Sequence, residues 1–192
     1  RQRQMCIRDR PYLAKGWEWS EDGMELTMHL MEGVKWSDGH PFTTEDVLFT
    51  WEDMILDPNV ASPKGASDWE FDGTMTQLEI IDDYCFKFIY PVAFPVQSLF
   101  QMDEGDFHIS PAHILKPLHP TYNADTDYAE FEASMPPDQT PVVLGEFVPV
   151  EYITDELMIL RRNPYYFGVD ETGKQLPYLD EVVFEKGPSG VG

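Results

Sequence analysis

Residues 16–52 read GWEWSEDGMELTMHLMEGVKWSDGHPFTTEDVLFTWE, and the order of the local signals in this stretch decides the fold. A Ser-Glu-Asp-Gly turn signal occupies 20–23. Apolar and polar residues then alternate over 24–30, which is the period of a half-buried strand. Trp36 precedes a second Asp-Gly turn signal at 38–39. The stretch therefore predicts a pair of strands followed by a tight turn.

A helix is predicted directly after that turn. Thr43 lies three residues before Asp46, a spacing that resembles a capping box at a helix start. Thr44 is the competing cap. The apolar residues that follow recur at helical spacing and predict one buried face: Val47, Leu48, Trp51 and Ile55.

This arrangement resembles the N-terminal lobe of the extracellular solute-binding proteins of ABC importers, in the large family that carries peptides, nickel and some oligosaccharides. A second segment, 161–185, resembles the family's Asn-Pro-x-Tyr segment followed by a strand that begins Pro-Tyr-Leu-Asp. The two segments occur in the family's order, and the resemblance covers roughly residues 11–185. One departure is clear: the family usually carries Gly-Thr-Gly-Pro-Tyr where residues 142–147 read VVLGEF.

The resemblance implies an α/β chain with the type II periplasmic-binding-protein fold, N-terminal lobe only, as a mixed sheet with flanking helices. Residues 11–140 would form a subdomain of that lobe. Residues 141–192 would be the return segment toward the main part of the lobe, truncated before the second lobe. The first ten residues, RQRQMCIRDR, have no helical or strand period and resemble translated adapter sequence, so residues 1–10 are interpreted as a non-native leader.

Composition narrows the class of protein. The net charge of −22 argues against a nucleic-acid partner, because phosphates attract Lys and Arg. The acidity indicates a cationic ligand, a salty medium or simply a solvated extracellular surface. No apolar run is long enough for a membrane helix, so direct insertion into a membrane is not expected. Cys85 is alone outside the excluded leader and alternates with aromatic residues, as a small strand side chain would.

The middle of the chain predicts a hairpin and a short helix. Residues 75–81 and 84–90 flank Asp82-Asp83, a two-residue turn signal. Ser110 followed by Pro111 predicts a helix start, with the helix running toward Leu115 and stopped by Pro117. Residues 119–141 are rich in proline and acid and are expected to form a surface excursion.

No catalytic constellation assembles from the sequence. The series His108, His113 and His119 suggests a metal site, but no carboxylate or cysteine lies at a recognised ligand spacing, so ordinary surface histidines are favoured. Acid pairs at 45–46 and 82–83 have helix-start and turn roles that explain them without a glycosidase dyad. We expect no catalytic residue, no metal and no cofactor.

Aromatic loops are the better indication of binding. In the resembling family this lobe lines the ligand cleft with two loops, which correspond here to 66–73 and 99–106. The candidate ligand-binding residues are Trp69, Phe71, Met102 and Asp103. Core packing is the competing interpretation of Trp69 and Phe71, and it is favoured for the tryptophans in periodic elements: Trp17, Trp19, Trp36 and Trp51.

The function that the resemblance implies is capture of a small extracellular solute, an oligopeptide or similar, and its delivery to an ABC importer permease. The protein would be periplasmic or extracellular, with a lipoprotein anchor as one option for the full-length form. The alternatives are an extracellular carbohydrate-active enzyme or sugar-binding module, and an interaction module outside transport that uses the same fold.

Overall fold

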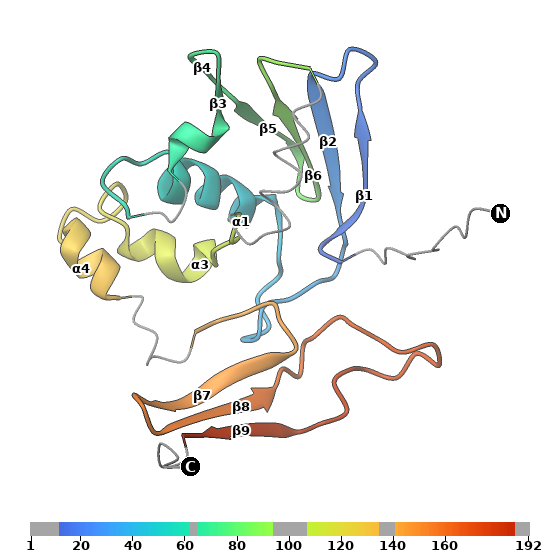
Figure 1. Ribbon diagram of the computed structural model, residues 1–192, viewed down its shortest axis with the longest axis vertical. Helices are drawn as coiled ribbons and strands as arrows, with labels where there is room; N and C mark the ends of the chain where they lie inside the picture. Colours follow the sequence, from blue (N-terminus) through green and yellow to red (C-terminus); the bar gives the residue numbers. More distant parts are fainter. Residues whose placement is uncertain (1–11, 62–64, 94–106, 135–140, 187–192) are drawn as a thin grey trace, which may run out of the picture.

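The computed structural model describes residues 12–61, 65–93, 107–134 and 141–186. Figure 1 shows an upper unit, in which a four-stranded sheet has the helices on one side, and a separate three-stranded sheet below it. Among the described residues, no helix has the length and apolar character needed to span a bilayer.

The upper sheet is antiparallel and has the order β1-β2-β6-β5. The strand pair predicted around the turn at 20–23 is confirmed. The predicted hairpin is also confirmed, but Asp82 pairs with Cys85, so the loop is one residue later than expected. The strands are β1 (Ala14–Trp19), β2 (Glu25–Leu30), β5 (Gln77–Asp82) and β6 (Cys85–Ile89).

A two-stranded ribbon precedes β5 and continues from a short 3₁₀ helix. The backbone N–H and the hydroxyl of Thr76 both donate to the carbonyl oxygen of Trp69, at 2.9 and 2.8 Å. Thr76 therefore interrupts the strand that the sequence predicts over 75–81. The elements are η2 (Ala66–Trp69), β3 (Glu70–Phe71) and β4 (Thr74–Met75).

Helix α1 (Thr44–Phe49) begins as the capping box predicts, and Thr43 is the N-cap. The Thr43 hydroxyl accepts from Glu45 N at 3.2 Å, and Asp46 Oδ2 accepts from Thr43 N at 3.0 Å. The helix continues as a π-helical turn, η1 (Thr50–Ile55). The local signal thus located the helix start at the correct residue.

Asp46 is buried and connects three segments. Besides Thr43, its carboxylate accepts from Trp36 Nε1 at 3.2 Å and from Ala112 N at 2.9 Å. Burial raises the pKa of Asp46. The predicted cap at Ser110 is wrong, because Asp46 rather than the Ser110 hydroxyl satisfies the N–H at the start of the next helix. That helix and those after it are α3 (Ala112–Leu115), η3 (Lys116–Leu118) and α4 (Tyr128–Ala133).

His119 contradicts the expectation of ordinary surface histidines, because it is fully buried. Its ring lies edge-on to Phe131, with the centroids 4.7 Å apart, and its Nδ1 accepts from Thr121 N at 3.3 Å. Phe131 belongs to a small second core formed where α4 packs against the end of α1.

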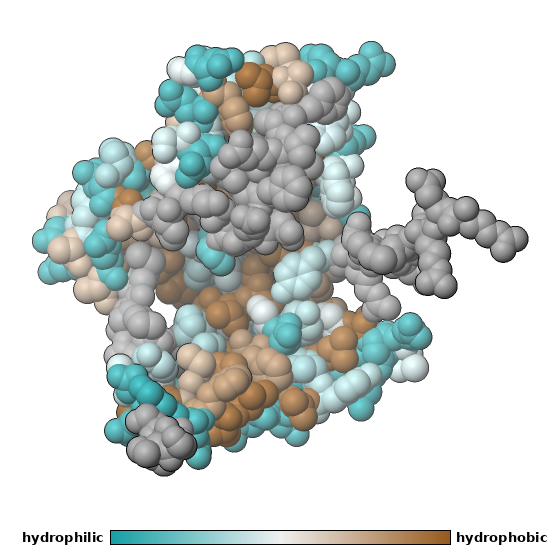
Figure 2. Space-filling model, viewed as in Figure 1, coloured by the Kyte–Doolittle hydropathy of each residue, from teal (hydrophilic) through white to brown (hydrophobic). Residues whose placement is uncertain are grey.

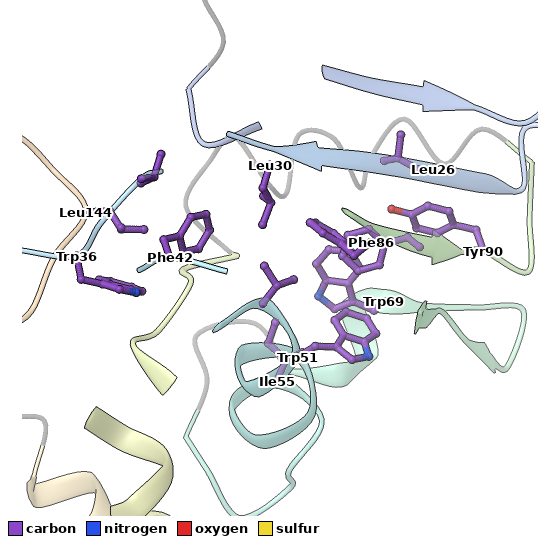
Figure 3. Packing of buried hydrophobic residues seen from close by; sticks show 13 residues of the cluster. Leu26, Leu30, Trp36, Phe42, Trp51, Ile55, Trp69, Phe86, Tyr90 and Leu144 are labelled. Carbon is purple, nitrogen blue, oxygen red and sulfur yellow. The ribbon is translucent and has the colours of Figure 1, made fainter. Parts of the chain in front are cut away.

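The main core lies between the upper sheet and the α1–η1 segment (Figure 3). Trp36 and Trp51 are 2% and 3% exposed, as expected for core residues. Trp17 was also expected to be buried, but it is 57% exposed. It lies on β1, which is an edge strand with a hydrogen-bonded neighbour on one side only, so its side chain has no neighbouring strand on the other side.

The lower sheet is antiparallel and has the order β7-β8-β9. Its strands are β7 (Phe147–Ile153), β8 (Leu157–Arg162) and β9 (Glu181–Glu185). Phe184 and Val183 on β9 are about half exposed. The apolar side chains of this sheet are therefore less covered than those of the upper unit.

The two segments that carry the family resemblance meet at residues 141–146, which run between the units. Ser37 N donates to Val143 O at 2.9 Å, and Val143 N donates to Ser37 Oγ at 3.0 Å. Asn163 is fully buried, and its side chain donates to Gly145 O at 2.9 Å. Residues Ser37, Gly39, Val143, Asn163 and Tyr165 are called the junction below, because they connect the upper unit to the lower sheet.

Candidate ligand-binding site

An apolar pocket of about 340 Å³ opens at one end of the upper core. This volume lies in the range of small-molecule sites. Strands β2 and β6 form its floor, and segments before β1, before α3 and before β7 form its walls. Residues that line it include Leu30, Phe86 and Phe88 from the floor and Tyr12, Phe107 and Leu144 from the walls.

Figure 2 shows apolar surface in the recess between the upper unit and the lower sheet. A different recess, of about 420 Å³, lies by the turn between β5 and β6. Its lining carries charges of both signs, such as Lys15 and Glu32, which pair with each other at 2.9 Å. The apolar pocket is the better candidate for a ligand site, since the described residues that line it form no ion pair with one another.

Trp69, a predicted ligand-binding residue, lies behind the pocket and is 1% exposed. Its ring stacks on Phe88 with centroids 5.3 Å apart, and it meets Phe107 edge-on at 5.6 Å. Trp69 therefore supports two pocket-lining rings. Phe71 is half-buried and lies edge-on to Tyr90 at 6.2 Å.

Met102 and Asp103, the other two predicted residues, lie outside the described residues. Direct contact of any of the four predicted residues with a ligand stays a prediction.

A polar group lies at the rim of the pocket. Tyr12 is 50% exposed, and its hydroxyl lies close enough to the hydroxyl of Tyr166 for each to affect the pKa of the other. The carboxylate of Glu146 also lies near the Tyr166 hydroxyl and raises its pKa. A carboxylate only accepts, so Tyr166 is the group that can donate to Glu146. Tyr12, Tyr166 and Glu146 are called the polar rim below.

The electrostatics of the polar rim keep its phenols protonated. Burial and the negative charge of Glu146 raise the pKa of Tyr12, and burial together with Tyr12 and Glu146 raises the pKa of Tyr166 to about 12. Both tyrosines therefore remain hydroxyl donors throughout the physiological pH range.

The ring of Tyr166 is held in place by the backbone beside it. A Cβ added at Gly168 would lie 2.4 Å from Tyr166 Cε1, so the ring occupies space that only glycine leaves open. Phe167 packs against both tyrosines, with ring centroids 5.0 Å from Tyr166 and 5.1 Å from Tyr12. These contacts fix the direction in which the Tyr166 hydroxyl points.

The three histidines that suggest a metal site in the sequence do not lie together in the structure. His108 is exposed at the pocket, and His119 is buried in the second core. His113 Nε2 lies 2.7 Å from Asp38 Oδ2, and the His113 ring stacks on His40 at 3.9 Å. In the described ranges, no group of three or more His, Cys, Asp or Glu side chains is arranged to hold a metal ion.

Sequence reasoning missed the polar rim. Its members come from three separate segments. Tyr166 is the tyrosine of the Asn-Pro-x-Tyr segment, but that motif does not indicate which residues lie beside it. A second signal belongs to Glu146. It follows Gly145, the one glycine that remains of the family's Gly-Thr-Gly-Pro-Tyr pattern, at the position where that pattern has proline. A charged residue in place of proline at this point was the available indication.

Comparison with known proteins decides the family. The profile of the bacterial extracellular solute-binding proteins, family 5 Middle, matches residues 10–190. The chain belongs to this family.

Its relatives include the periplasmic alpha-galactoside-binding protein of Rhizobium meliloti, which is 50% identical over 91% of this chain and 25% of that protein. The periplasmic oligopeptide-binding protein OppA of Salmonella typhimurium is 28% identical, over 88% of this chain and 31% of OppA. Among solved structures, the periplasmic binding protein MelB of Agrobacterium fabrum, in complex with stachyose, superposes with a TM-score of 0.83. That match is 49% identical and covers 92% of this chain and 26% of MelB.

These matches confirm the predicted fold class, an α/β chain that corresponds to the N-terminal part of a periplasmic binding protein. The chain spans about a quarter of the length of the alpha-galactoside-binding protein and of MelB. The division at residue 140 into a subdomain and a return segment stays a prediction. Residues 1–10 lie outside the described residues.

Proposed function

We propose that the full-length protein is the solute-binding component of an ABC importer and that its ligand is an oligosaccharide with α-galactoside linkages. The observation that carries the ligand class is 50% identity, over nearly the whole chain, to a protein named for binding alpha-galactosides. The structural match to a stachyose complex at 49% identity supports the same class.

An oligopeptide ligand is the second candidate, and the relationship to OppA favours it. That relationship is more distant, at 28% identity. The apolar pocket also argues against peptides, because none of the described residues that line it is Lys or Arg, and a peptide carboxylate in a pocket calls for a cation or another strong donor.

The matched proteins are binding proteins rather than enzymes, so the comparisons give no support to a carbohydrate-active enzyme. The proposal keeps sugar as the ligand, as in that alternative, but the protein binds the sugar without covalent chemistry. The periplasm is the compartment that the relatives' names support. An importer permease as partner, and a lipoprotein anchor in the full-length form, remain parts of this proposal.

Calorimetry of the full-length protein tests the ligand class. We expect saturable binding of stachyose and no saturable binding of triglycine at the same concentrations. Saturable binding of triglycine with none of stachyose would replace the sugar by a peptide. Hydrolysis of stachyose during the titration would contradict the assignment as a binding protein.

The chain itself provides a second test. Pockets that bind small ligands well typically enclose roughly 70 to 90% of the ligand surface. A single lobe leaves one side of the ligand exposed, so we expect the isolated chain to show no saturable binding at micromolar stachyose. Micromolar binding by the chain alone would contradict the two-lobed capture model.

A further inference from the structure

We propose that Tyr12, Tyr166 and Glu146 bind the hydroxyl groups of a neutral sugar, while the apolar wall of the adjoining pocket packs against the C–H face of the same sugar ring. This inference rests on the proposed function and names the residues that would select its ligand.

The first argument is the continuity of the polar rim with the pocket. Tyr12 belongs to both, since it lines the pocket and its ring contacts Phe167, which also packs against Tyr166. Glu146 follows two residues after Leu144, another lining residue. A ligand that enters the pocket therefore meets aromatic and aliphatic surface from Phe107 and Leu144 on one side and the polar rim beside it.

This combination matches the surface of a sugar. A pyranose ring has a face of C–H groups that packs on apolar and aromatic side chains, and its edge carries hydroxyls that both donate and accept. Rigid aromatic residues with a polar end suit such a ligand, because they offer apolar area at one end and a hydrogen bond at the other.

The second argument is hydrogen-bonding capacity. A carboxylate has about four lone-pair sites, and one donor from Tyr166 leaves most of the capacity of Glu146 for other donors. A sugar with vicinal hydroxyls supplies two donors to one carboxylate. Hydrogen bonds to a charged acceptor are also stronger than those between neutral groups.

The third argument is charge. The described residues that line the pocket contain no Lys or Arg, so an anionic ligand would find no counter-charge there. The polar rim carries one carboxylate, that of Glu146, and so adds negative rather than positive charge. A neutral polyol therefore fits the site better than a zwitterionic peptide or an organic acid.

The fourth argument is preorganisation. Phe167 and the bare backbone of Gly168 hold the Tyr166 ring before any ligand arrives. The raised pKa values keep both phenols protonated and uncharged. Groups that are fixed in advance lose less conformational entropy on binding.

Three substitutions in the full-length protein test the assignment: Glu146→Gln, Tyr166→Phe and Tyr12→Phe. Each removes an acceptor charge or one hydroxyl and keeps the size of the side chain. Glu151→Gln and Tyr152→Phe are matched controls, because they make the same changes on β7 at residues that do not line the pocket. The dissociation constant for stachyose is measured by calorimetry, and the melting temperature without ligand is measured beside it.

We expect Glu146→Gln to weaken stachyose binding by about tenfold or more, because a hydrogen bond to a charged group is lost. The tyrosine variants should weaken it several-fold, and the controls should stay close to the parent protein. Melting temperatures should stay within about 2 °C of the parent, because no core side chain is removed.

Stachyose binding that stays within about twofold of the parent in both Glu146→Gln and Tyr12→Phe would overturn the inference. If Tyr166→Phe also loses thermal stability, Tyr12→Phe decides, because Tyr12 is half exposed and its hydroxyl carries little of the fold. A parent protein that binds no stachyose contradicts the proposed ligand class itself, and with it this inference. Titration of the parent protein therefore distinguishes a wrong ligand class from a wrong assignment of the residues that bind the ligand.

Discussion

Replacing Gly39 by alanine perturbs the junction where the two family segments meet. Gly39 has a φ of +91°, a conformation that costs a residue with a Cβ roughly 1–2 kcal/mol. The new Cβ would also lie 3.0 Å from Tyr165 Cζ. Tyr165 is 43% exposed, so its ring can move, but it would leave its place under the Lys35 ammonium, which lies 5.7 Å from the ring centroid. An exposed cation–π contact is worth about 0.5–1 kcal/mol. We therefore expect Gly39→Ala to destabilise the protein by about 1.5–3 kcal/mol.

Gly33→Ala is the matched control. Gly33 has a φ of +81°, and a Cβ there would meet no atom within 4 Å. Its cost should be the backbone strain alone, about 1–2 kcal/mol. Urea denaturation of both variants measures the free energy of unfolding, and the difference between them isolates the contact with Tyr165. A double-mutant cycle with Tyr165→Ala then tests that contact directly.

Two results would refute this reasoning about the junction. One is an equal loss of stability in Gly39→Ala and Gly33→Ala, which would mean that Tyr165 yields without cost. The other is a larger loss of stability in Gly39→Ala than in Gly33→Ala that remains when Tyr165 is replaced by alanine. Contact with the Tyr165 ring would then not be its cause.

Three further predictions concern the cap, the pH dependence and the leader. Thr43→Ala should cost about 0.5–2 kcal/mol in urea denaturation, because it removes the N-cap hydroxyl. Thr44→Ala tests a different contact, since the Thr44 hydroxyl donates to Asp82 O at 2.8 Å, and a loss confined to Thr44→Ala would contradict the cap assignment. Burial alone would raise the pKa of Asp38, but hydrogen bonds from His40 N–H and the His113 ring lower it below its ordinary value of 3.8. The stability that Asp38 contributes is therefore present above that pH and is lost as the pH falls through its folded value. When the melting temperature is measured against pH, Asp38→Asn should show a smaller decrease at acidic pH than the parent protein. An equal decrease in both proteins would exclude this contribution. If residues 1–10 are a non-native leader, deleting them should change the melting temperature by no more than about 1–2 °C. A drop of several degrees would show that these residues belong to the fold.

The sequence predicted those parts of the structure whose causes are local. The capping box at Thr43 and Asp46 needs only residues within one turn, and the alternation that buries Leu26 and Leu30 needs only one strand. The predicted burial of Trp17 was wrong, because periodicity does not say which strand lies at the edge of a sheet.

Long-range contacts account for what the sequence did not predict. Asp46 caps a helix that begins 66 residues later, and no spacing rule connects the two positions. The polar rim brings Tyr12 next to Glu146 and Tyr166, which lie far along the chain. Trp69 was selected as an aromatic residue in a loop, but the ring packs inward because Phe88 and Phe107 offer it a larger apolar surface than the solvent side does.

The junction and the candidate site depend on the same short segment. Val143 is fixed by Ser37 on one side, and Gly145 is fixed by Asn163 on the other. Leu144 lies between these two anchors and lines the pocket. Glu146 comes directly after Gly145, and its carboxylate belongs to the polar rim. A change that loosens either anchor should therefore move an apolar wall and a polar group of the candidate site together. If the proposed site binds the ligand, the two family segments would support binding indirectly, because they hold in place a segment that neither of them contains.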